Sequence, residues 1–363
     1  MVEKIGVSGL LKEKYQGVIV DGDSVRIGKY LFYYDDGRTY QEGYYKDGKP
    51  DSIWLNYYQS GARKSLFHYK NGLKEGVFTF WKIDGTIYQT GNYYKGMLHG
   101  TLVTYHPNGQ VDSRSEYKSG MLCGITEVYA DDGKSRLISS YKNDTLDGIW
   151  KTFYDTGELN YSGYKKAGKY ADTLYTYYKN GNLQRKVFYA DGRLNGELIS
   201  FYESGKVNEI SFYKNGIQQG AFQSFFEDGS LMEKGQYLDD KKTGVWVSYY
   251  PNGVIHSEGE FSRGFLVGMW YVYNLNGTAK QTGAYCKGKA CGDWSYFDNN
   301  GVIKASGKYI DDMQIGIWTV FYPNGTVAGR VRYLNGKPIG AKWLYDTDGR
   351  LIRRFEIDNS VQK

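Results

Sequence analysis

Four histidines and three cysteines are the residues with the most obvious capacity for catalysis or metal binding. They are His68, His99, His106, His256, Cys123, Cys286 and Cys291. Both kinds of chemistry need several such groups held together in a fixed geometry. The sequence contains no nucleophile elbow, phosphate-binding loop or metal-ligand spacing in a suitable context. It therefore predicts no active site, no metal site and no cofactor.

Acidic pairs and cysteines near turns need separate consideration. Asp239-Asp240 and Asp311-Asp312 suggest calcium binding, but both pairs stand at predicted turns, where Asp is favoured for backbone reasons. Cys286 and Cys291 flank the predicted turn Lys287-Gly288-Lys289-Ala290 and could face each other across a hairpin. Three cysteines do not make a disulfide framework, so we favour free thiols at both positions.

A strict 24-residue repeat determines where all of these residues stand. One glycine recurs at this spacing without insertion or deletion, at positions 37, 61, 85, 109, 133, 157, 181, 205, 229, 253, 277, 301, 325 and 349. A period of this size is typical of a repeat array in which each unit stacks on its neighbours. The four histidines occupy four different positions within their repeats, so the array does not gather them into a column.

Each repeat carries two turn signals. The first is the recurring glycine, which Asn or Asp precedes in most repeats, as in Asn252-Gly253. We expect a two-residue type I′ turn here, with both residues at positive φ. The second turn follows eleven residues later and contains Gly, or Asp at 144, 240 and 312. Asp tolerates the left-handed region, so the exceptions support a positive φ at this position.

Aromatic columns set the expected strand register. An aromatic residue stands four positions before every recurring glycine, and a tyrosine column stands eight positions after it, with Lys165 as an internal exception that Tyr164 could replace. With the expected turn, Trp246 pairs with Gly259 across the hairpin, and equivalent aromatic–glycine pairs recur along the chain. A large ring over a strand glycine recovers buried area that glycine cannot supply.

Two turns and two short strands per repeat predict an all-β fold. We expect an elongated, single-layer antiparallel β-meander of about 14 tandem 24-residue β-hairpin repeats. Strand twist should coil it into a trough or a solenoid-like spiral. Residues 1–27 form an irregular N-terminal cap or half-repeat, and residues 28–363 form the array, whose last unit is atypical.

Two sets of residues are candidates for binding. The first comprises the C-terminal tryptophans and two tyrosines of the same repeats, which as a surface ladder could stack on sugars or anchor a protein: Trp246, Trp270, Trp294, Trp318, Tyr249 and Tyr273. As rings over glycines they would simply be the core, which we favour. The second is a basic ribbon, for an acidic partner or lipid headgroups: Lys46, Lys70, Lys118, Lys142, Lys166 and Lys214. A solvated edge beside turns is its simpler explanation.

Composition and hydropathy exclude several functional classes. The net charge is +6, from 46 Lys and Arg against 40 Asp and Glu, which is too mild to predict nucleic-acid binding. No run approaches the ~20 apolar residues of a membrane span. No signal peptide is recognisable near the N-terminus. We expect a cytoplasmic or assembly-associated protein, or an exported one if a leader has been removed.

The repeat pattern resembles a known family. Gly244-Val245-Trp246 followed by Tyr249-Tyr250-Pro251-Asn252-Gly253, and the equivalent Gly316 to Gly325, are similar to MORN (membrane occupation and recognition nexus) repeats. The resemblance extends from residue 28 to about 350 and is closest to a bacterial variant described as antitoxin-like. It implies an elongated antiparallel sheet that serves as an interaction scaffold and carries no catalytic residues.

These observations predict a non-enzymatic scaffold for protein–protein interaction. It would work within a larger assembly, such as a secretion, toxin–immunity or virion complex. The main alternative is a carbohydrate- or cell-envelope-binding repeat module, because aromatic and glycine repeats also resemble choline- and glucan-binding repeats. A peripheral lipid-binding protein is a weaker alternative. Buried tryptophans would argue against sugar stacking.

Overall fold

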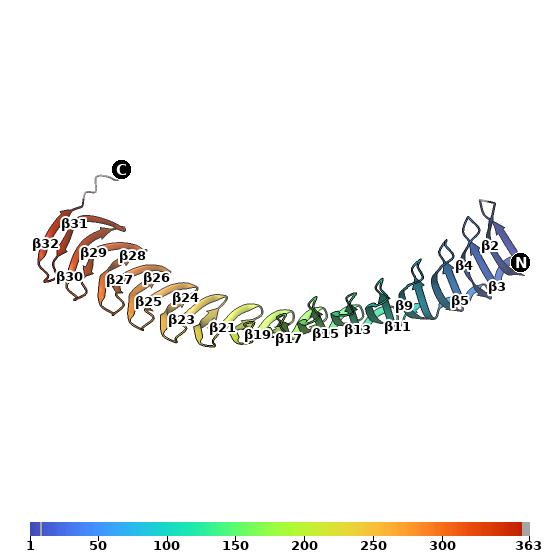
Figure 1. Ribbon diagram of the computed structural model, residues 1–363, viewed down its shortest axis with the longest axis horizontal. Coiled ribbons are helices and arrows are strands. Elements are labelled where there is room, and N and C mark those ends of the chain that lie inside the picture. The colour runs from blue at the N-terminus through green and yellow to red at the C-terminus, as the bar shows by residue number, and fades with distance from the viewer. Residues whose placement is uncertain (8, 358–363) are drawn as a thin grey trace. The chain divides into compact units, whose positions relative to one another are not determined.

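The computed structural model describes residues 1–7 and 9–357. These residues form β-strands and connecting turns, with no helix among them, so the predicted all-β fold is confirmed. The chain divides into two compact units, Met1–Gly181 and Asn182–Lys363. We call them unit 1 and unit 2 and describe each by itself. Figure 1 labels strands of each unit, which follow one another in chain order.

The described residues of unit 1 form seventeen strands. They are β1 (Val2–Ile5), β2 (Leu11–Val20), β3 (Asp23–Tyr33), β4 (Thr39–Lys46), β5 (Lys49–Tyr57), β6 (Arg63–Lys70), β7 (Leu73–Lys74), β8 (Gly76–Trp81), β9 (Ile87–Tyr94), β10 (Met97–Leu98), β11 (Gly100–Tyr105), β12 (Val111–Lys118), β13 (Met121–Tyr129), β14 (Ser135–Lys142), β15 (Thr145–Phe153), β16 (Leu159–Lys166) and β17 (Lys169–Tyr177).

Residues 182–357, the part of unit 2 that the structure describes, form fifteen strands. They are β18 (Leu183–Ala190), β19 (Arg193–Phe201), β20 (Val207–Lys214), β21 (Ile217–Phe225), β22 (Leu231–Leu238), β23 (Lys241–Tyr249), β24 (Ile255–Ser262), β25 (Phe265–Tyr273), β26 (Ala279–Cys286), β27 (Lys289–Phe297), β28 (Ile303–Ile310), β29 (Met313–Phe321), β30 (Val327–Leu334), β31 (Lys337–Tyr345) and β32 (Leu351–Glu356).

Within each unit the strands form an antiparallel meander. In unit 2, for example, β23 pairs with β24 and β24 pairs with β25. In unit 1, β4 pairs with β3 and with β5 in the same way. Each 24-residue repeat thus supplies two neighbouring strands, as the sequence predicts. The last six residues of the predicted array, 358–363, lie outside the described residues.

The first turn of each repeat differs from the predicted type I′ turn. In the hairpin β23–β24, Gly253 has a φ of 82°, whereas Asn252 is not among the residues at positive φ. The N–H of Gly253 donates to the carbonyl of Tyr250, and the N–H of Tyr250 donates to the carbonyl of Val254. This is a three-residue loop, a type I turn closed by one left-handed residue. The prediction of a two-residue loop was therefore wrong.

Asn252 is favoured for a reason other than φ. Its side-chain oxygen accepts the N–H of Val254, and its side-chain nitrogen donates to the carbonyl of Leu275 in the next repeat. The first bond is an Asx turn that stabilises the loop locally. The second ties successive loops together, and Tyr250 does the same by donating from its hydroxyl to the carbonyl of Tyr273.

The predicted strand register is nevertheless correct. A one-residue bulge follows the loop, because Tyr249 pairs with Ile255 whereas Ser248 pairs with Ser257. The extra residue shifts the pairing back to the register that a two-residue loop would give. The predicted pairs of aromatic residues with glycines are therefore confirmed: Tyr30 with Gly43, Phe78 with Gly91, Trp150 with Gly163, Phe222 with Gly235, Trp246 with Gly259, Trp270 with Gly283 and Trp294 with Gly307.

At the second turn of the repeat, two consecutive residues have a left-handed backbone conformation. Asp47 and Gly48 have φ values of 47° and 74°, and Asp144, Asp240 and Asp312 have values of 62°, 61° and 67°. The prediction of positive φ at this turn is confirmed. The three Asp carboxylates also accept a backbone N–H from the preceding repeat, as Asp312 does from Ala290 at 2.6 Å. Replacing Gly by Asp here therefore adds a bond between repeats.

A second residue at positive φ, glycine in most repeats and Ser52 or Asp172 in two of them, stands in a wide bulge that the sequence did not reveal. Glu258 pairs with Tyr271 and Glu260 pairs with Val267, so the single residue Gly259 faces three residues of β25. The first of these three is Gly268, with a φ of 66°. The extra residues let the strand turn Trp270 inward on one side and push Met269 outward on the other.

Candidate interaction surface

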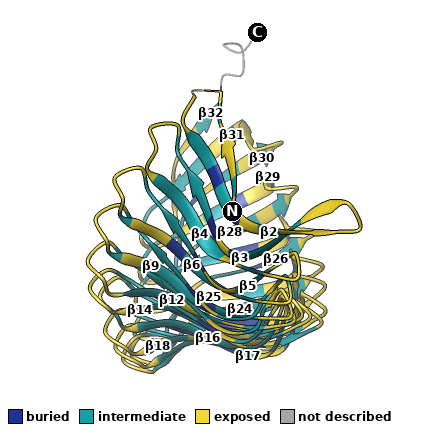
Figure 2. Cartoon of the chain, turned by 90° about the vertical axis from the view of Figure 1, so that its right-hand side faces the viewer, coloured by how far each residue is buried: buried dark blue, intermediate teal, exposed yellow. Residues whose placement is uncertain are grey.

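The two faces of the sheet differ in what they expose. We call the side that carries the tryptophan column the ladder face and the opposite side the open face. Because side chains alternate along a strand, Trp246 and Ser248 point to the ladder face, and Val247 and Tyr249 point to the open face. In Figure 2 the buried residues form short dark-blue segments within the strands, and the turns are exposed.

The predicted tryptophan candidates lie on the ladder face and pack on glycines. Trp246, Trp294 and Trp318 are buried, and Trp270 is half-buried; Trp246 is only 2% exposed. Each indole covers a glycine of the preceding strand, so that a Cβ on Gly235, Gly259, Gly283 or Gly307 would overlap the ring of Trp246, Trp270, Trp294 or Trp318 respectively. The expectation that each ring covers its own register partner was therefore wrong for these repeats, because the wide bulge turns the ring toward the other neighbour.

Each indole N–H is also satisfied within the sheet. Trp246, Trp294 and Trp318 donate to the carbonyls of Gln236, Ala284 and Lys308, each at 3.2 Å. The ring face lies on glycine and the polar edge is bonded to the backbone. These tryptophans therefore have the contacts of a core rather than those of a binding ladder.

The rings of unit 2 form an unbroken aromatic ladder. Successive ring centroids along it lie 5.0–6.4 Å apart, mostly edge to face, and the ten members are Phe222, Tyr237, Trp246, Phe261, Trp270, Tyr285, Trp294, Tyr309, Trp318 and Tyr333. Such contacts supply the buried area that a single-layer sheet would otherwise obtain from a second layer.

Lys165 takes the tyrosine's place in unit 1. Its ammonium lies 3.9 Å from the ring centroid of Tyr170 and 5.1 Å from that of Trp150. Cation–π attraction therefore fills the gap in the tyrosine column. Tyr164 is exposed on the open face, so the expectation that Tyr164 compensates was wrong.

The two tyrosine candidates lie on the open face, opposite the tryptophans. Tyr273 donates a hydrogen bond to Glu258 at 2.7 Å, and the Lys234 ammonium lies 5.8 Å from the ring centroid of Tyr249. Burial, followed by the Glu258 carboxylate, raises the pKa of Tyr273 to about 12. The structure thus does not bring the predicted tryptophans and tyrosines together into one site.

The basic ribbon is fully exposed at the second turns. Lys46, Lys70, Lys118, Lys142 and Lys166 belong to unit 1, and Lys214 belongs to unit 2. Acidic side chains beside the unit 1 ribbon are engaged with turn backbone: Asp51, Glu75, Asp144 and Asp147 accept the N–H groups of Asn71, Lys95, Leu122 and Ala167. A carboxylate keeps its negative charge when it accepts an N–H: the Asn71 N–H lowers the pKa of Asp51, and the Lys46 ammonium contributes to the lowering. The ribbon is therefore a row of exposed lysines beside acidic side chains.

A row of exposed β-branched residues runs beside the ribbon, and sequence reasoning missed it. Ile53, Val77, Thr101, Ile125 and Ile149 recur every 24 residues in unit 1, and the four aliphatic members are 45–55% exposed. They stand at the crest of the wide bulges, where the extra residues push them outward. We call this row the β-branched stripe. Its period was visible in the sequence, but β-branched residues are common in any strand.

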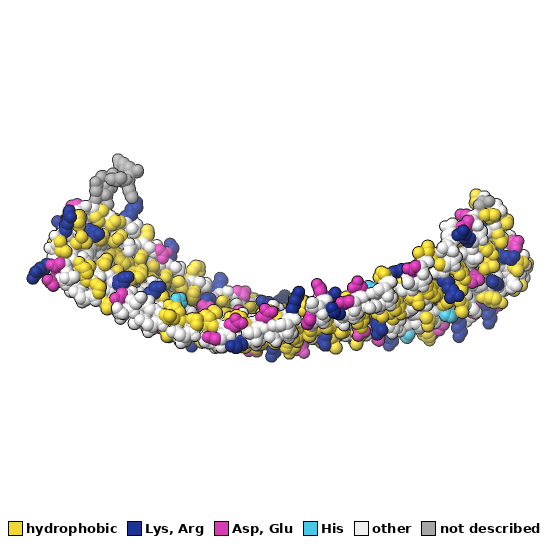
Figure 3. All heavy atoms as spheres, viewed as in Figure 1, with side chains coloured by type: hydrophobic (Ala, Val, Ile, Leu, Met, Phe, Trp, Pro, Cys, Tyr) yellow, Lys and Arg dark blue, Asp and Glu magenta, His cyan; other side chains and the backbone are white. Residues whose placement is uncertain are grey.

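Shallow hollows accompany the stripe on the open face. One of about 510 Å³ is lined by Thr101, Val103, Arg114, Glu116, Ile125 and Glu127. A second, three repeats closer to the N-terminus, is lined by equivalent positions that include Glu42, Tyr44, Ile53 and Leu55. Figure 3 shows hydrophobic side chains exposed among Lys and Arg side chains along unit 1. The open face therefore offers repeated apolar contacts beside charged side chains of both signs.

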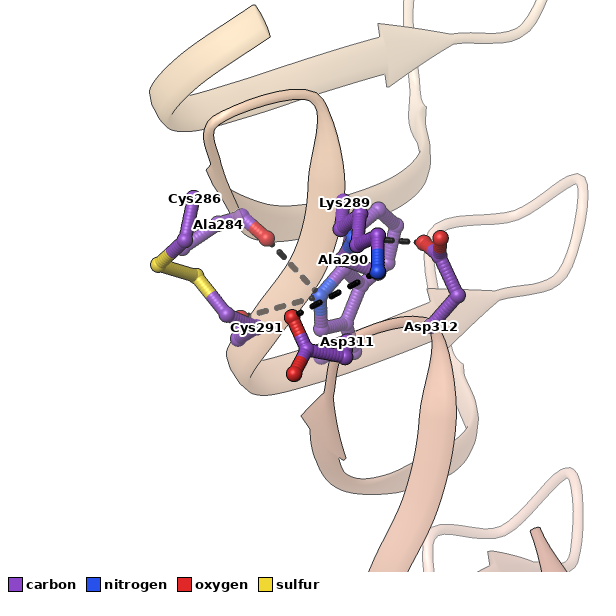
Figure 4. The surroundings of a disulfide bond; sticks show 8 residues. Ala284, Cys286, Lys289, Ala290, Cys291, Asp311 and Asp312 are labelled. Atoms are coloured by element: carbon purple, nitrogen blue, oxygen red, sulfur yellow. Dashed lines mark hydrogen bonds and ion pairs between the residues drawn. A yellow bond between two sulfur atoms is a disulfide. The ribbon is translucent and has the colours of Figure 1, made fainter. Parts of the chain in front are cut away.

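Cys286 and Cys291 form a disulfide, which corrects the expectation of free thiols. Their Cα atoms are 5.8 Å apart across the second turn, because both side chains project from the same face of the hairpin (Figure 4). Trp294 donates to the carbonyls of Ala284 and Cys291 on either side of this bond. Cys123 is a free thiol.

The histidines remain apart, as the repeat predicts. His106 lies 3.4 Å from Asp112 and 3.0 Å from the carbonyl of Tyr129, and His256 lies 3.3 Å from the Ser248 hydroxyl. Within residues 1–7 and 9–357, no three His, Cys, Asp or Glu side chains are placed to hold a metal ion. The same part of the chain has no helix suited to spanning a membrane.

One protein-family model matches several segments of this repeat array. The model described as "MORN repeat variant" matches eight segments: 26–47, 98–119, 146–164, 173–191, 194–215, 218–239, 242–262 and 314–335. These matches support a MORN-type repeat protein. Seven of the segments start two residues before the wide-bulge glycine, and the eighth starts at Thr173, directly after Asp172 at the equivalent position, so they follow the hairpin repeat of the structure. No curated protein sequence matches the chain.

Solved structures with similar strands are much larger proteins. They include the TcdB2–TccC3–Cdc42 complex (10% identity, 97% of this chain and 26% of that chain, TM-score 0.17) and TcdB2–TccC3 (12%, 98% and 25%, 0.17). A third is the Photorhabdus luminescens Tc holotoxin pore (11%, 94% and 22%, 0.17). The chain spans about a quarter of the length of these proteins. The MORN-type repeats fit a scaffold built from tandem hairpins.

Proposed function

We propose that this MORN-type array is a non-enzymatic scaffold that holds a protein partner on its open face. The observation that carries the proposal is the difference in side-chain burial between the two faces of the sheet. Aromatic rings and glycines bury one another on the ladder face, whereas the open face keeps exposed β-branched residues in a regular row. Exposed apolar residues that recur in line are typical of an interaction surface.

The proposal also includes the extent of the repeat array and its N-terminal cap. Residues 28–363 would act as one repeat array, and residues 1–27 would cap it. In support, β1 and β2 pair with a register shift at Lys4 and Ile5 before the regular repeats begin. A cap of this kind covers the first repeat, which otherwise lacks a neighbour. A role within a secretion, toxin–immunity or virion assembly remains part of the proposal.

The disulfide supports an oxidising location for the protein. Disulfides persist in secreted and periplasmic proteins and are rare in reducing cytosol. Cys286–Cys291 closes an exposed turn, where a reductant has access. We therefore favour export of the chain over a cytoplasmic location.

A protein partner fits the geometry better than a sugar. Carbohydrate stacking requires a free aromatic face, and the predicted ladder presents buried or half-buried rings that lie on glycine. Of the two open-face tyrosine candidates, Tyr273 donates its hydroxyl to Glu258, and Tyr249 has the Lys234 ammonium 5.8 Å from its ring centroid. No arrangement on the ladder face favours the carbohydrate alternative.

The experiment that tests the scaffold function is capture with the full-length chain, followed by reconstitution with the purified candidate partner. We expect one protein to form a complex of fixed stoichiometry, measured by size-exclusion chromatography with light scattering. The variant Ile53→Thr/Ile125→Thr/Ile149→Thr should weaken that complex while circular dichroism stays unchanged. A chain that forms no stoichiometric protein complex, or that retains only glycan, would contradict the proposal.

A further inference from the structure

The open face of unit 1 combines two parallel rows with one spacing. Ile125 pairs with Ser140, and Lys142 lies two residues further along the same strand, so Ile125 and Lys142 share the open face. Ile149 with Tyr164 and Lys166, and Ile53 with His68 and Lys70, repeat this arrangement. The β-branched stripe and the basic ribbon therefore run side by side along unit 1.

A third row adds apolar surface beyond the lysines. Lys70 pairs with Leu73 and Lys118 pairs with Met121 across the second turns, so each pair points to the same face. Leu73, Met97 and Met121 are all exposed there. The surface is thus a strip of aliphatic side chains with ammonium groups set into it once per repeat, except at Tyr94, and it matches a partner that carries apolar and acidic side chains together.

The spacing of these rows selects a conformation for that partner. Neighbouring strands lie about 4.7–4.9 Å apart, so one two-strand repeat advances about 9.4–9.8 Å along the array. A polyproline II segment advances about 9.3 Å in three residues. An extended β-strand advances about 6.6–6.8 Å per two residues, and an α-helix about 5.4 Å per turn, and neither matches one repeat.

We propose that the open face of unit 1 binds an acidic protein segment in the polyproline II conformation, which runs along the array at three residues per repeat. Apolar side chains of the segment pack on Ile53, Val77, Ile125 and Ile149, and its carboxylates face Lys70, Lys118, Lys142 and Lys166. This proposal rests on the proposed scaffold function and names the chemical class of its partner.

Charge and exposure support this assignment. Lys70, Lys118, Lys142 and Lys166 are exposed and form no salt bridge with the described residues, so their ammonium groups are available to an incoming acid. The neighbouring carboxylates Asp51, Glu75, Asp144 and Asp147 accept backbone N–H groups instead. A polyproline II segment has no internal hydrogen bonds and is already extended, so binding costs little additional ordering. The regular row of side chains on a sheet surface suits a linear ligand that can contact several repeats at once.

The test uses the full-length chain and fluorescein-labelled peptides in an anisotropy titration. The probe has five copies of the tripeptide Glu-Val-Pro, and the matched control has five copies of Glu-Val-Pro-Pro, whose step of about 12.4 Å does not fit one repeat. We expect saturable binding of the first peptide and at least about tenfold weaker binding of the second. Equal affinities, or no saturation of the first peptide by roughly 1 mM, would overturn the proposal.

Charge-reversal variants locate the site. Lys70→Glu/Lys118→Glu/Lys142→Glu/Lys166→Glu should weaken binding of the Glu-Val-Pro peptide at least about tenfold. The matched control Lys206→Glu/Lys241→Glu/Lys280→Glu/Lys304→Glu makes the same change in net charge at exposed positions of unit 2 and should leave binding within about twofold. Circular dichroism confirms that both variants fold. Equal losses in the two variants would show non-specific charge attraction and refute the site.

Two further experiments distinguish binding to a lipid surface, and failure of the scaffold function, from binding of an acidic segment. Vesicles of phosphatidylcholine with about 30% phosphatidylserine would sediment with the chain if anionic lipid were the ligand. Ribbon-dependent binding to these vesicles without binding of the peptide would overturn the peptide proposal. A reconstituted protein partner that binds while the peptide does not would refute the acidic segment and leave the scaffold function standing. If neither a protein partner nor the peptide binds, the scaffold function and the acidic segment are both refuted.

Discussion

The aromatic ladder of unit 2 and the segment 98–145 of unit 1 share one backbone arrangement but carry different side chains at equivalent positions. From Phe222 to Tyr333 each ring contacts the next, and glycines beneath the rings make room for them. In the segment 98–145 the equivalent pairs are Leu102 with Ser115 and Thr126 with Ser139. Leu or Thr replaces the ring and Ser replaces the glycine, while the strand register stays the same.

The difference shows that register and stability have separate origins. Turns and bulges fix the register in both segments, because Leu102–Ser115 pairs in the same manner as Trp246–Gly259. Buried area differs, since one aromatic ring buries about 150–250 Å² and a Ser or Thr buries much less. Ser139 is also fully buried with no partner for its hydroxyl. We therefore expect the segment 98–145 to open more readily than the ladder.

The largest expected effect comes from removing a ladder ring. Trp246→Ala should lower the free energy of unfolding by about 3–5 kcal/mol, because it leaves a cavity over Gly235 and frees the carbonyl of Gln236. Leu102→Ala, at the equivalent position of segment 98–145, should cost less, about 2–3 kcal/mol. Urea unfolding followed by circular dichroism measures both. Equal losses would remove the basis of the comparison between the segments.

The next effect concerns the space beneath the rings. Gly259→Ala places a Cβ against the indole of Trp270 and should destabilise the protein by about 1–3 kcal/mol through overpacking. Ser139→Ala, at the equivalent position of segment 98–145, removes an unpartnered buried hydroxyl and should be neutral or slightly stabilising. Thermal melts of the two variants should shift in different directions. A harmless Gly259→Ala would show that the rings do not need glycine beneath them.

The disulfide should reinforce the ladder at one turn. Cys286→Ser/Cys291→Ser should lower stability by about 2 kcal/mol, the value expected for closing a short loop. The control is Cys123→Ser, which removes a free thiol in segment 98–145 and should change little. Reduction of the wild-type protein should reproduce the double variant. An unchanged melting temperature after complete reduction would mean that the turn is held by its backbone bonds alone.

Alkaline pH should produce the smallest effect. Burial, with the Glu258 hydrogen bond, raises the pKa of Tyr273 in the ladder segment to about 12, above the ordinary value of 10.0. The folded state therefore holds this proton more tightly than the unfolded state, and the stabilisation present below pH 10 is lost as the pH rises toward 12. Denaturation midpoints at pH 9 to 12 measure the loss. Tyr273→Phe should flatten this dependence, and an unchanged slope would contradict the assignment.

The sequence was sufficient for the repeat and its pairings. The constant spacing of Gly253 and its equivalents fixed which strands are neighbours, and Asp144, Asp240 and Asp312 identified the left-handed turn. The first turn was mispredicted because Asn-Gly suits two different loops. In the structure Asn252 acts through its side chain rather than through positive φ.

The candidate surface was only partly visible in the sequence. The basic ribbon could be found from its period, but the β-branched stripe could not be distinguished from ordinary strand preference at Ile125 or Ile149. Only the wide bulges reveal that these residues project from the sheet. The placement of Trp270 over Gly259 has the same cause, and the Cys286–Cys291 bond depends on a redox environment that residues alone do not specify.

The central claim is that the ladder face is the packed interior and the open face is the accessible surface. Hydroxyl-radical footprinting of the full-length chain with mass spectrometry tests it directly, because oxidation follows side-chain exposure. We expect Trp246, Trp294 and Trp318 to be protected, and Tyr44, Tyr164 and Met269 on the open face to be oxidised readily. Tryptophans oxidised as fast as the open-face residues would contradict the account.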